Sequence, residues 1–457
     1  MGLPRGELAR KLVHIGCVGF AFLLRYMSGG QAAAMAAGAF LLNWQVLPRV
    51  GGKGLWRGAD HAKGYAIGIL LYPLSVLGLT LWFWSSLWIA AALWGVLAVG
   101  DGMASLVGQA VGGPRLPWNE RKGWAGLVAF VLFGTAAAAA LIAWTARLPL
   151  DLGSWHAGRT VGLAFCVSLA CGLVESIPTT LDDNLTVPLA GAVLFPLFAQ
   201  ADPWILATDP DLARHVALGL VLNGAIALVA WRARSIDGPG ALSAIVIGTA
   251  ITAGLGLPAL ALMVTFFVVG TAATRLGYRI KAARGIAQER GGARGWRHAW
   301  ANGGVPALLA LLAGLTAVPL RDLLVIAYAG AVATAAADTC SSEIGKAYGR
   351  RTFLITSFRP VPPGTEGAIS LEGTLGGLLG AALVAAVGSV LGVYSWPLAG
   401  LVTLAGLLGS LAESVIGTVA ERRGWLDNNL LNALNTAIGA GFAVLLIDLS
   451  AGVGLAR

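Results

Sequence analysis

The feature that most constrains this chain is a series of apolar stretches, of about 17–24 residues each, that recurs along its whole length. Each stretch is long enough to cross a hydrocarbon core of about 30 Å as an α-helix. Charged residues make up only 12% of the 457 residues, about half of what a soluble protein needs on its surface. The sequence therefore predicts an all-α, polytopic transmembrane helical bundle.

The apolar stretches predict about 15 spans. They lie near 9–27, 31–47, 65–84, 86–109, 124–145, 160–177, 186–200, 215–231, 241–256, 258–275, 303–319, 323–345, 373–393, 397–420 and 429–450. With this list, the loops that hold Arg115, Arg121, Lys122, Arg350 and Arg351 share one face with the N-terminus. The positive-inside rule then places the N-terminus and these loops in the cytoplasm.

Two segments of the chain repeat each other. Asp101, Gly108 and Gly112 match Asp338, Gly345 and Gly349 at one constant offset, and the pattern Glu175, Asp182-Asp183-Asn184 matches Glu413, Asp427-Asn428-Asn429. An even number of predicted spans separates the copies, so they should be parallel. We therefore expect two membrane domains, 1–205 and 206–457, with their boundary in the acidic segment 201–214.

Carboxylates within or beside predicted spans are the strongest functional candidates. Asp101 lies in otherwise apolar sequence, where a bare carboxylate costs at least about 2–3 kcal/mol. It should therefore face a polar cavity or a partner, and an interhelical hydrogen bond is the simpler structural alternative. The same holds for Asp338, and Glu175 and Glu413 stand near predicted helix ends. These four carboxylates are the predicted catalytic groups.

Glycines and cations at the predicted helix ends favour phosphate binding. Gly108 and Gly112 lead into Arg115, and the loop with Arg121 and Lys122 leads into a helix that contains Gly126. Glycine permits close backbone approach to a phosphate, and a helix N-terminus offers free N–H groups to an anion. Close helix packing and simple N-caps explain the same residues, so both interpretations stay open. The second copy offers Gly345, Gly349, Ser370, Glu372 and Gly373.

The Asp182-Asp183-Asn184 cluster and its match Asp427-Asn428-Asn429 are the predicted metal ligands. Carboxylate and amide oxygens suit Mg²⁺, which commonly bridges nucleotide phosphates. A turn followed by an N-cap is the structural alternative. The four cysteines stand in apolar stretches and imply neither a disulfide framework nor a zinc site. The net charge of +9 is explained by loop cations, so we expect no nucleic-acid partner.

The first half of the chain resembles the CTP-dependent isoprenoid alcohol kinases, the family of dolichol kinase and phytol kinase. The matching pieces are Arg10-Lys11-Leu-Val-His14-Ile-Gly16, Gly100-Asp101 with Gly108 and Gly112, Lys122 with Gly126, and Glu175 through Asp183-Asn184. The second half resembles the membrane family of phytyl-phosphate kinase and animal transmembrane protein 19. Its pieces are Ala301-Asn302-Gly303-Gly304, Ala337-Asp338-Thr339-Cys340-Ser341-Ser342-Glu343, Gly367-Ala-Ile-Ser370-Leu-Glu372-Gly373-Thr374 and Asp427-Asn428-Asn429.

The sequence departs from the kinase pattern Lys-Ser/Thr-x-Glu-Gly in both halves. The first half reads Lys122-Gly123-Trp124-Ala125-Gly126, without the hydroxyl and the glutamate, and the second half has Ile369 where the lysine would fall. Either half could therefore be weakened as a catalyst, or the two loops could serve one shared site.

The resemblance implies a fused lipid kinase that uses CTP, or another nucleoside triphosphate, together with Mg²⁺. The first half would phosphorylate a phytol-like isoprenoid alcohol, and the second would convert the monophosphate to the diphosphate. Membrane lipid and nucleotide are thus the expected partners. The full set of predicted nucleotide-binding residues is Gly108, Gly112, Arg121, Lys122, Gly126, Asn302, Glu343, Gly345, Lys346, Gly349, Ser370, Glu372 and Gly373.

Two other functions remain open from the sequence. A cytidylyltransferase would use the same CTP and Mg²⁺ to activate a lipid phosphate. A transporter would also carry intramembrane carboxylates in repeated halves, although transporter sites lie near the bilayer midplane. The predicted carboxylates lie instead toward the cytoplasmic face, which favours the kinase.

Overall fold

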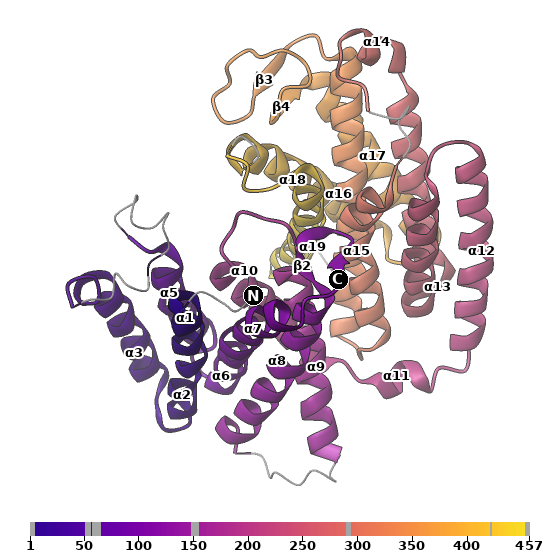
Figure 1. Ribbon diagram of the computed structural model, residues 1–457. Helices are drawn as coiled ribbons and strands as arrows, with labels where there is room; N and C mark the ends of the chain where they lie inside the picture. The colour runs from indigo at the N-terminus through magenta and orange to yellow at the C-terminus, as the bar shows by residue number, and fades with distance from the viewer. Residues whose placement is uncertain are drawn as a thin grey trace. The chain divides into compact units, whose positions relative to one another are not determined.

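The chain is built almost entirely of helices, as the computed structural model in Figure 1 shows. The structure describes residues 5–50, 56, 65–147, 155–288, 294–420 and 423–452. They form two compact units, residues 1–200 and 201–457. The expected functional division at residues 205 and 206 stays a prediction.

Unit 1 begins with short and irregular helices and continues with longer ones. Its elements are α1 (Arg5–Gly16), α2 (Val18–Ala21), the 3₁₀ turn η1 (Phe22–Tyr26), α3 (Gly29–Leu41), the π-helical turn η2 (Leu42–Val46), α5 (Ile67–Trp82), α6 (Leu87–Gly95), the π-helical turn η4 (Val96–Asp101), α7 (Gly102–Val111), β1 (Arg115–Leu116), β2 (Asn119–Gly123), α8 (Trp124–Thr145), α9 (Trp155–Glu175) and α10 (Asp183–Gln200).

Unit 2 repeats part of this order with longer helices. Its elements are α11 (Pro203–Ala207), α12 (Leu212–Arg232), α13 (Gly238–Arg275), α14 (Tyr278–Ala283), α15 (Trp296–Gly314), α16 (Leu320–Tyr348), β3 (Thr352–Leu354), β4 (Ala368–Ser370), α17 (Leu371–Val390), α18 (Trp396–Ala420) and α19 (Asn428–Gly452).

The predicted helical membrane architecture is confirmed, while the exact number of spans stays a prediction. Within the described residues, nine helices are long and apolar enough to cross a membrane. One of them, α13, holds two of the predicted spans, 241–256 and 258–275. Two further predicted spans are broken: 9–27 is divided among α1, α2 and η1, and 31–47 ends in the turn η2.

Helix α13 folds back on itself at Gly256, whose φ of 76° lies outside the helical region. Near its end, Arg275 donates a hydrogen bond to Ser235 Oγ, just before its start. A straight helix of 38 residues would hold its ends about 57 Å apart. The glycine, followed by Pro258, therefore makes a tight turn between two antiparallel arms.

Helix α16 is the central helix of unit 2. It packs against α13, α15, α17, α18 and α19, and its run of small residues from 329 to 337 is buried. A Cβ on Gly377 of α17 would lie 2.8 Å from the Ala337 carbonyl oxygen. Small residues thus let the helix backbones meet closely, as is usual in membrane bundles, and they place Asp338 in the interior.

In unit 1 the continuous segment α6–η4–α7 is the most buried candidate span. Its wide π-helical turn ends at Asp101. Such turns within α-helices are rare and frequently mark functional sites. The corresponding segment of unit 2 is α-helical throughout.

Both units bring the same helix ends together. In unit 1, α7 and α9 end where α8 and α10 begin, and the antiparallel pair β1–β2 connects α7 to α8. In unit 2, α16 and α18 end where α17 and α19 begin, and β3–β4 connects α16 to α17. In Figure 1 the β3–β4 hairpin lies at the same end of unit 2 as α14. Polar groups at these ends would lie at a membrane surface, not at its centre.

Candidate active sites

Three carboxylates from three different segments meet in unit 1. Asp101, Glu175 and Asp183 each place a carboxylate oxygen within 4.8 Å of the other two. They come from the end of η4, the end of α9 and the start of α10. Asp101 and Glu175 are buried and Asp183 is partly buried. Three hard oxygen ligands at this spacing fit a divalent cation such as Mg²⁺.

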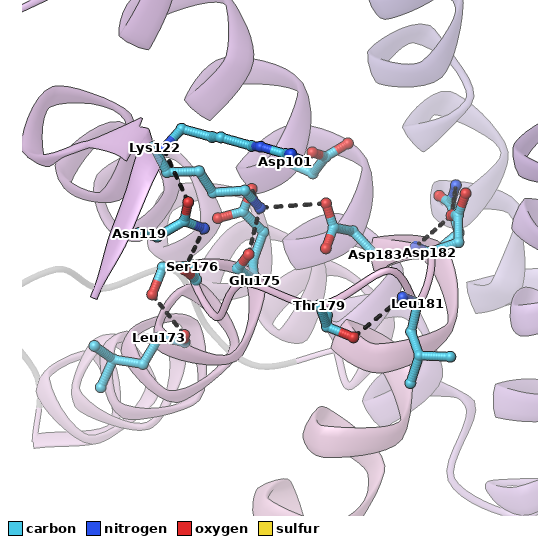
Figure 2. Close-up of polar contacts among 12 residues, drawn as sticks. Asp101, Asn119, Lys122, Leu173, Glu175, Ser176, Thr179, Leu181, Asp182 and Asp183 are labelled. Atoms are coloured by element: carbon cyan, nitrogen blue, oxygen red, sulfur yellow. Dashed lines mark hydrogen bonds and ion pairs between the residues drawn. The ribbon is translucent and has the colours of Figure 1, made fainter. Parts of the chain in front are cut away.

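Lys122 neutralises part of this cluster from strand β2. Its Nζ lies 2.6 Å from Glu175 Oε1 and 3.4 Å from Asp183 Oδ2, and Figure 2 shows its side chain reaching between the two carboxylates. Burial opposes its charge, but Glu175 and then Asp183 outweigh burial, so the pKa of Lys122 is raised. Burial raises the pKa of Asp183, and the charge of Lys122 offsets part of that effect. The lysine therefore stays charged at neutral pH.

Asp101 has its own cationic partners on α1. Lys11 Nζ donates a hydrogen bond of 2.8 Å to Asp101 Oδ2, and His14 Nε2 lies 3.4 Å from the same oxygen. His14 Nε2 also lies 3.2 Å from the Leu97 carbonyl oxygen in the π-helical turn. The Arg10-Lys11-His14 segment, which is part of the resemblance to the isoprenoid alcohol kinases, thus supplies two groups to the site.

The other two predicted metal ligands of unit 1, Asp182 and Asn184, are hydrogen-bonded to each other. Asp182 Oδ1 accepts hydrogen bonds from the Asn184 backbone N–H at 3.0 Å and from its side-chain amide at 2.7 Å. Asp182 therefore caps the start of α10. Asn184 Oδ1 is buried and has no hydrogen-bond partner among the described residues. Figure 2 shows Asp182 lying apart from Asp101.

The predicted phosphate-binding glycines of unit 1 lie mainly at a helix crossing. A Cβ on Gly108 would lie 3.2 Å from the Gly126 Cα, so α7 and α8 touch there through their backbones. Gly112 ends α7 with a φ of 67°, and Arg121 is exposed on β2. Close packing therefore explains Gly108 and Gly126, while nucleotide contact stays a prediction for these four residues.

Unit 2 holds a polar cavity at the corresponding place. Asp338, Lys346, Glu366, Glu413 and Asn428 line it together with backbone and hydroxyl groups of the 364–374 segment. The carboxyl groups of Asp338 and Glu413 are hydrogen-bonded to each other. Two carboxyl groups in contact need a shared proton or a cation between them. This pair therefore also fits a divalent cation.

Five predicted residues lie around the start of α17 beside this cavity. Ser370 Oγ accepts a hydrogen bond of 3.1 Å from the Gly373 backbone N–H, which makes Ser370 an N-cap. A Cβ on Gly345 would lie 3.7 Å from the Gly373 Cα, so α16 and α17 cross there as α7 and α8 do. Glu372 accepts a long hydrogen bond of 3.4 Å from the Arg350 backbone N–H. The last predicted glycine, Gly349, lies next to Ser370.

Glu343 is not among the described residues that line this cavity. Its carboxylate pairs with Lys281 Nζ, and the side chains are 3% and 1% exposed, respectively. Lys281 Nζ also donates to the Thr274 carbonyl oxygen at 2.7 Å. A buried, fully hydrogen-bonded pair of this kind is typical of a structural contact between α14, α13 and α16.

Asn302 lies in a second cavity of unit 2, which is mostly apolar. Its neighbours in the lining include Asn223, Arg294 and His298, and its side-chain amide donates to the His298 carbonyl oxygen at 3.1 Å. Burial, and then the charge of Arg294, lowers the pKa of His298. The structure therefore separates Asn302 from the lining of the polar cavity.

The Asp427-Asn428-Asn429 cluster divides in the same way as its match in unit 1. Asp427 is exposed and accepts a hydrogen bond of 2.8 Å from the Leu430 backbone N–H, which caps α19. Asn428 lines the polar cavity, as Asp183 joins the carboxylate cluster. Asn429 Oδ1 is buried and has no partner among the described residues, as is true of Asn184 Oδ1.

Sequence reasoning missed Lys281, Arg294 and Glu366 as individual residues. Lys281 and Arg294 stand in a strongly basic stretch before α15, which resembles the other cytoplasmic-type loops and gives no sign that it contributes buried side chains. Glu366 stands inside the segment that carried the resemblance, next to Gly367. This position in the sequence was the only indication that Glu366 belongs to the site.

These features define an integral membrane protein with a carboxylate-rich polar site in each unit. The sequence profile described as "Integral membrane protein DUF92" matches residues 221–440. The uncharacterized membrane protein sll0875 of Synechocystis sp. is 40% identical over 200 residues, which cover 44% of this chain and 78% of that protein. The chain belongs to this DUF92 family of integral membrane proteins.

Two plant relatives carry more specific names. Protein VTE6, chloroplastic, of Arabidopsis thaliana is 37% identical over 216 residues, which cover 46% of this chain and 65% of that protein. Farnesol kinase, chloroplastic, of the same plant is 32% identical over 209 residues, covering 42% of this chain and 66% of the kinase. The chain thus spans about two thirds of each. No solved structure matches the chain.

Proposed function

We propose that this protein is a membrane kinase of isoprenoid lipids that uses CTP as the phosphate donor together with Mg²⁺. Unit 1 phosphorylates an isoprenoid alcohol, and unit 2 phosphorylates the resulting monophosphate. The observation that carries this proposal is the cluster of Asp101, Glu175 and Asp183 around Lys122 at the helix ends of unit 1. The similarity to a farnesol kinase supports the same reaction class.

The position of the sites suits this chemistry. A long isoprenoid alcohol stays in the bilayer, so its hydroxyl group must meet a water-soluble nucleotide at the membrane surface. Both polar sites lie where helices end and short hairpins begin. The basic loops at these ends support a cytoplasmic position for the sites.

In unit 1, Asp101 is the group that accepts the proton of the alcohol. The hydroxyl oxygen attacks the terminal phosphorus of the nucleotide, the bond to the bridging oxygen breaks, and the nucleoside diphosphate leaves. Lys11 and His14 hold the Asp101 carboxylate in place through its Oδ2. General-base assistance of this type contributes about 10²–10⁴-fold to a rate.

Glu175 and Asp183 would hold Mg²⁺, and Lys122 would bind phosphate oxygens beside them. When bound, the ion neutralises charge on the phosphates during transfer. Asp182 and Asn184 support the ligands by fixing the start of α10. In unit 2, Asp338, Glu413 and Asn428 have the corresponding roles, and Lys346 supplies the cation, because Ile369 stands at the position of Lys122.

Incubation of the purified full chain with CTP, Mg²⁺ and a panel of isoprenoid alcohols tests this function. We expect lipid mono- and diphosphates that carry label from γ-labelled CTP and none from α-labelled CTP. Label from the α-position would instead identify a cytidylyltransferase. Substrate-stimulated uptake into vesicles without any phosphorylated lipid would identify a transporter.

A further inference from the structure

The second cavity of unit 2 is apolar along most of its wall and cationic at one end. It lies between α12, the two arms of α13 and α15, and its wall includes Ile226, Ile247, Met263 and Phe267. None of the described residues that line it is acidic. In Figure 1, α12 lies beside α13 at the edge of unit 2, and only 17% of its apolar stretch is buried. The cavity is thus bordered by a helix whose apolar surface is largely uncovered within unit 2.

Arg294 is the cationic group of this cavity. Its backbone is fixed by hydrogen bonds to Ser235 and Asp237, and its guanidinium carbon lies 5.6 Å from the centre of the Phe266 ring. Among the described residues, its side chain makes no ion pair or hydrogen bond. A largely enclosed guanidinium without a counter-charge is costly, and its charge is best balanced by a bound anion.

The two carboxylates that attract Arg294 electrostatically are already engaged. Glu343 attracts Arg294 electrostatically but pairs directly with Lys281. Asp338 also attracts it but is hydrogen-bonded to Glu413. Among the described residues of unit 2, no carboxylate therefore pairs with the cationic end of the apolar cavity.

Arg294 lies between the apolar cavity and the helix that carries Asp338. A Cβ on Gly270 would lie 3.1 Å from an Arg294 guanidinium nitrogen and 3.2 Å from Thr339 Cγ2. Thr339 directly follows Asp338 in α16, and the absence of a side chain at Gly270 leaves room for the guanidinium. An anion bound by Arg294 would thus lie beside the polar cavity that Asp338 lines.

We infer that this apolar cavity is the acceptor site of unit 2 and that it binds a single-chain lipid monophosphate. The first part of the isoprenoid chain packs between α12, α13 and α15. Arg294 binds the phosphate, and His298 and Asn302 border the same cavity. An uncharged alcohol would leave the Arg294 guanidinium unpaired and should bind more weakly. This inference deepens the proposed function of unit 2 and rests on it.

Lipid binding without nucleotide tests this inference. The purified full chain is titrated in detergent with a C20 isoprenyl monophosphate or with the corresponding alcohol, and thermal unfolding reports binding. We expect the wild type to bind the monophosphate at least tenfold more tightly. Arg294→Gln should weaken monophosphate binding by about 10–100-fold, the range for hydrogen bonds to charged groups, and leave alcohol binding unchanged.

Arg297→Gln is the matched control, because Arg297 is an exposed arginine three residues further along, stacked on Trp296. It should bind the monophosphate as the wild type does. A second variant, Ala244→Phe, fills the apolar wall; we expect it to lose C20 monophosphate binding and to keep binding of a C5 monophosphate. This change in chain-length preference would not follow from a merely structural defect.

Several results would overturn the inference: equal binding of alcohol and monophosphate by the wild type, wild-type binding by Arg294→Gln, or equal losses in Arg294→Gln and Arg297→Gln. The proposed kinase function fails separately. If Arg294 governs monophosphate binding but no phosphate is transferred from CTP, the binding site stands and the kinase proposal falls. If Arg294→Gln phosphorylates the monophosphate with the wild-type KM, the kinase proposal stands and the inferred binding site falls.

Discussion

The two units place an aspartate at the same point of a similar helix arrangement but balance its charge differently. In unit 1, Asp101 contacts Lys11 at 2.8 Å, and Glu175 contacts Lys122 at 2.6 Å. In unit 2, Asp338 is hydrogen-bonded to another carboxyl group, Glu413, and the enclosed Arg294 has no ion pair among the described residues. Unit 1 is thus internally paired, whereas unit 2 keeps separate positive and negative regions.

This difference indicates which acceptor each unit suits. A site whose cations are already paired has little to gain from an anionic acceptor and accommodates a neutral hydroxyl group. A site with a spare guanidinium gains from an anion, because charge-assisted hydrogen bonds are among the strongest that a protein makes. This contrast supports the proposed order of the two reactions, with the alcohol in unit 1 and the monophosphate in unit 2.

The largest expected effect comes from Asp101→Asn. Loss of the proton acceptor should slow phosphorylation of the alcohol by about 10²–10⁴-fold and leave phosphorylation of added monophosphate unchanged. Separate assays with the two lipid substrates measure this. Equal losses of both steps would mean that the units share one site and would break the comparison between them.

The buried pair of Lys281 and Glu343 gives the next largest effect. Lys281→Met leaves the Glu343 carboxylate buried without a partner and should cost about 3–5 kcal/mol of stability, measured by thermal or chemical unfolding. The double variant Lys281→Met/Glu343→Leu should recover most of that loss and retain phosphorylation of the monophosphate. If the double variant is stable but lacks this activity, the predicted nucleotide-binding role of Glu343 would be supported instead.

Alanine at the two helix crossings should have a smaller effect, and an unequal one. A Cβ at Gly373 would lie 2.7 Å from the Ser341 carbonyl oxygen, whereas a Cβ at Gly126 would lie 3.2 Å from the Ala104 carbonyl oxygen. Overpacking costs about 1–3 kcal/mol, so Gly373→Ala should lower the unfolding temperature more than Gly126→Ala. The opposite order would show that the crossing in unit 2 is the looser one.

The smallest effects are expected at the helix caps Asp182 and Asp427. Replacing either residue by alanine removes a cap hydrogen bond and should cost about 1 kcal/mol of stability. The Mg²⁺ concentration needed for half-maximal activity should rise by less than tenfold, because the caps only position the metal ligands. An increase of tenfold or more in that concentration would instead make the residue a metal ligand.

The sequence was informative where residue type alone indicates the structure or the chemistry, as apolar stretches and intramembrane carboxylates do. The apolar stretches predicted helical spans, and the matched motifs led to Asp101, Glu175, Asp338 and Glu413. The sequence could not show which side chains each motif contacts in the folded protein. Asp182 and Asp183 are adjacent and alike, yet one caps a helix and the other joins the carboxylate cluster.

The long-range pairs were equally hidden. Lys281 and Glu343 are 62 positions apart, and both stand among other polar residues. Only the fold-back of α13 brings α14 against α16, and the turn at Gly256 is visible in the sequence merely as a glycine before Leu257-Pro258. In the sequence, Arg294 is one of several cations in a basic stretch. Only the packing of α13 and α15 shows that its side chain lines a cavity.

The central claim is that the two units catalyse consecutive steps, and Asp338→Asn tests it most directly. The wild type and this variant are given isoprenoid alcohol, CTP and Mg²⁺, and the lipid products are followed over time by mass spectrometry. We predict that the wild type forms diphosphate through a transient monophosphate, whereas Asp338→Asn accumulates monophosphate at the wild-type initial rate. Diphosphate formation at the wild-type rate by the variant, or loss of the monophosphate as well, would contradict the account.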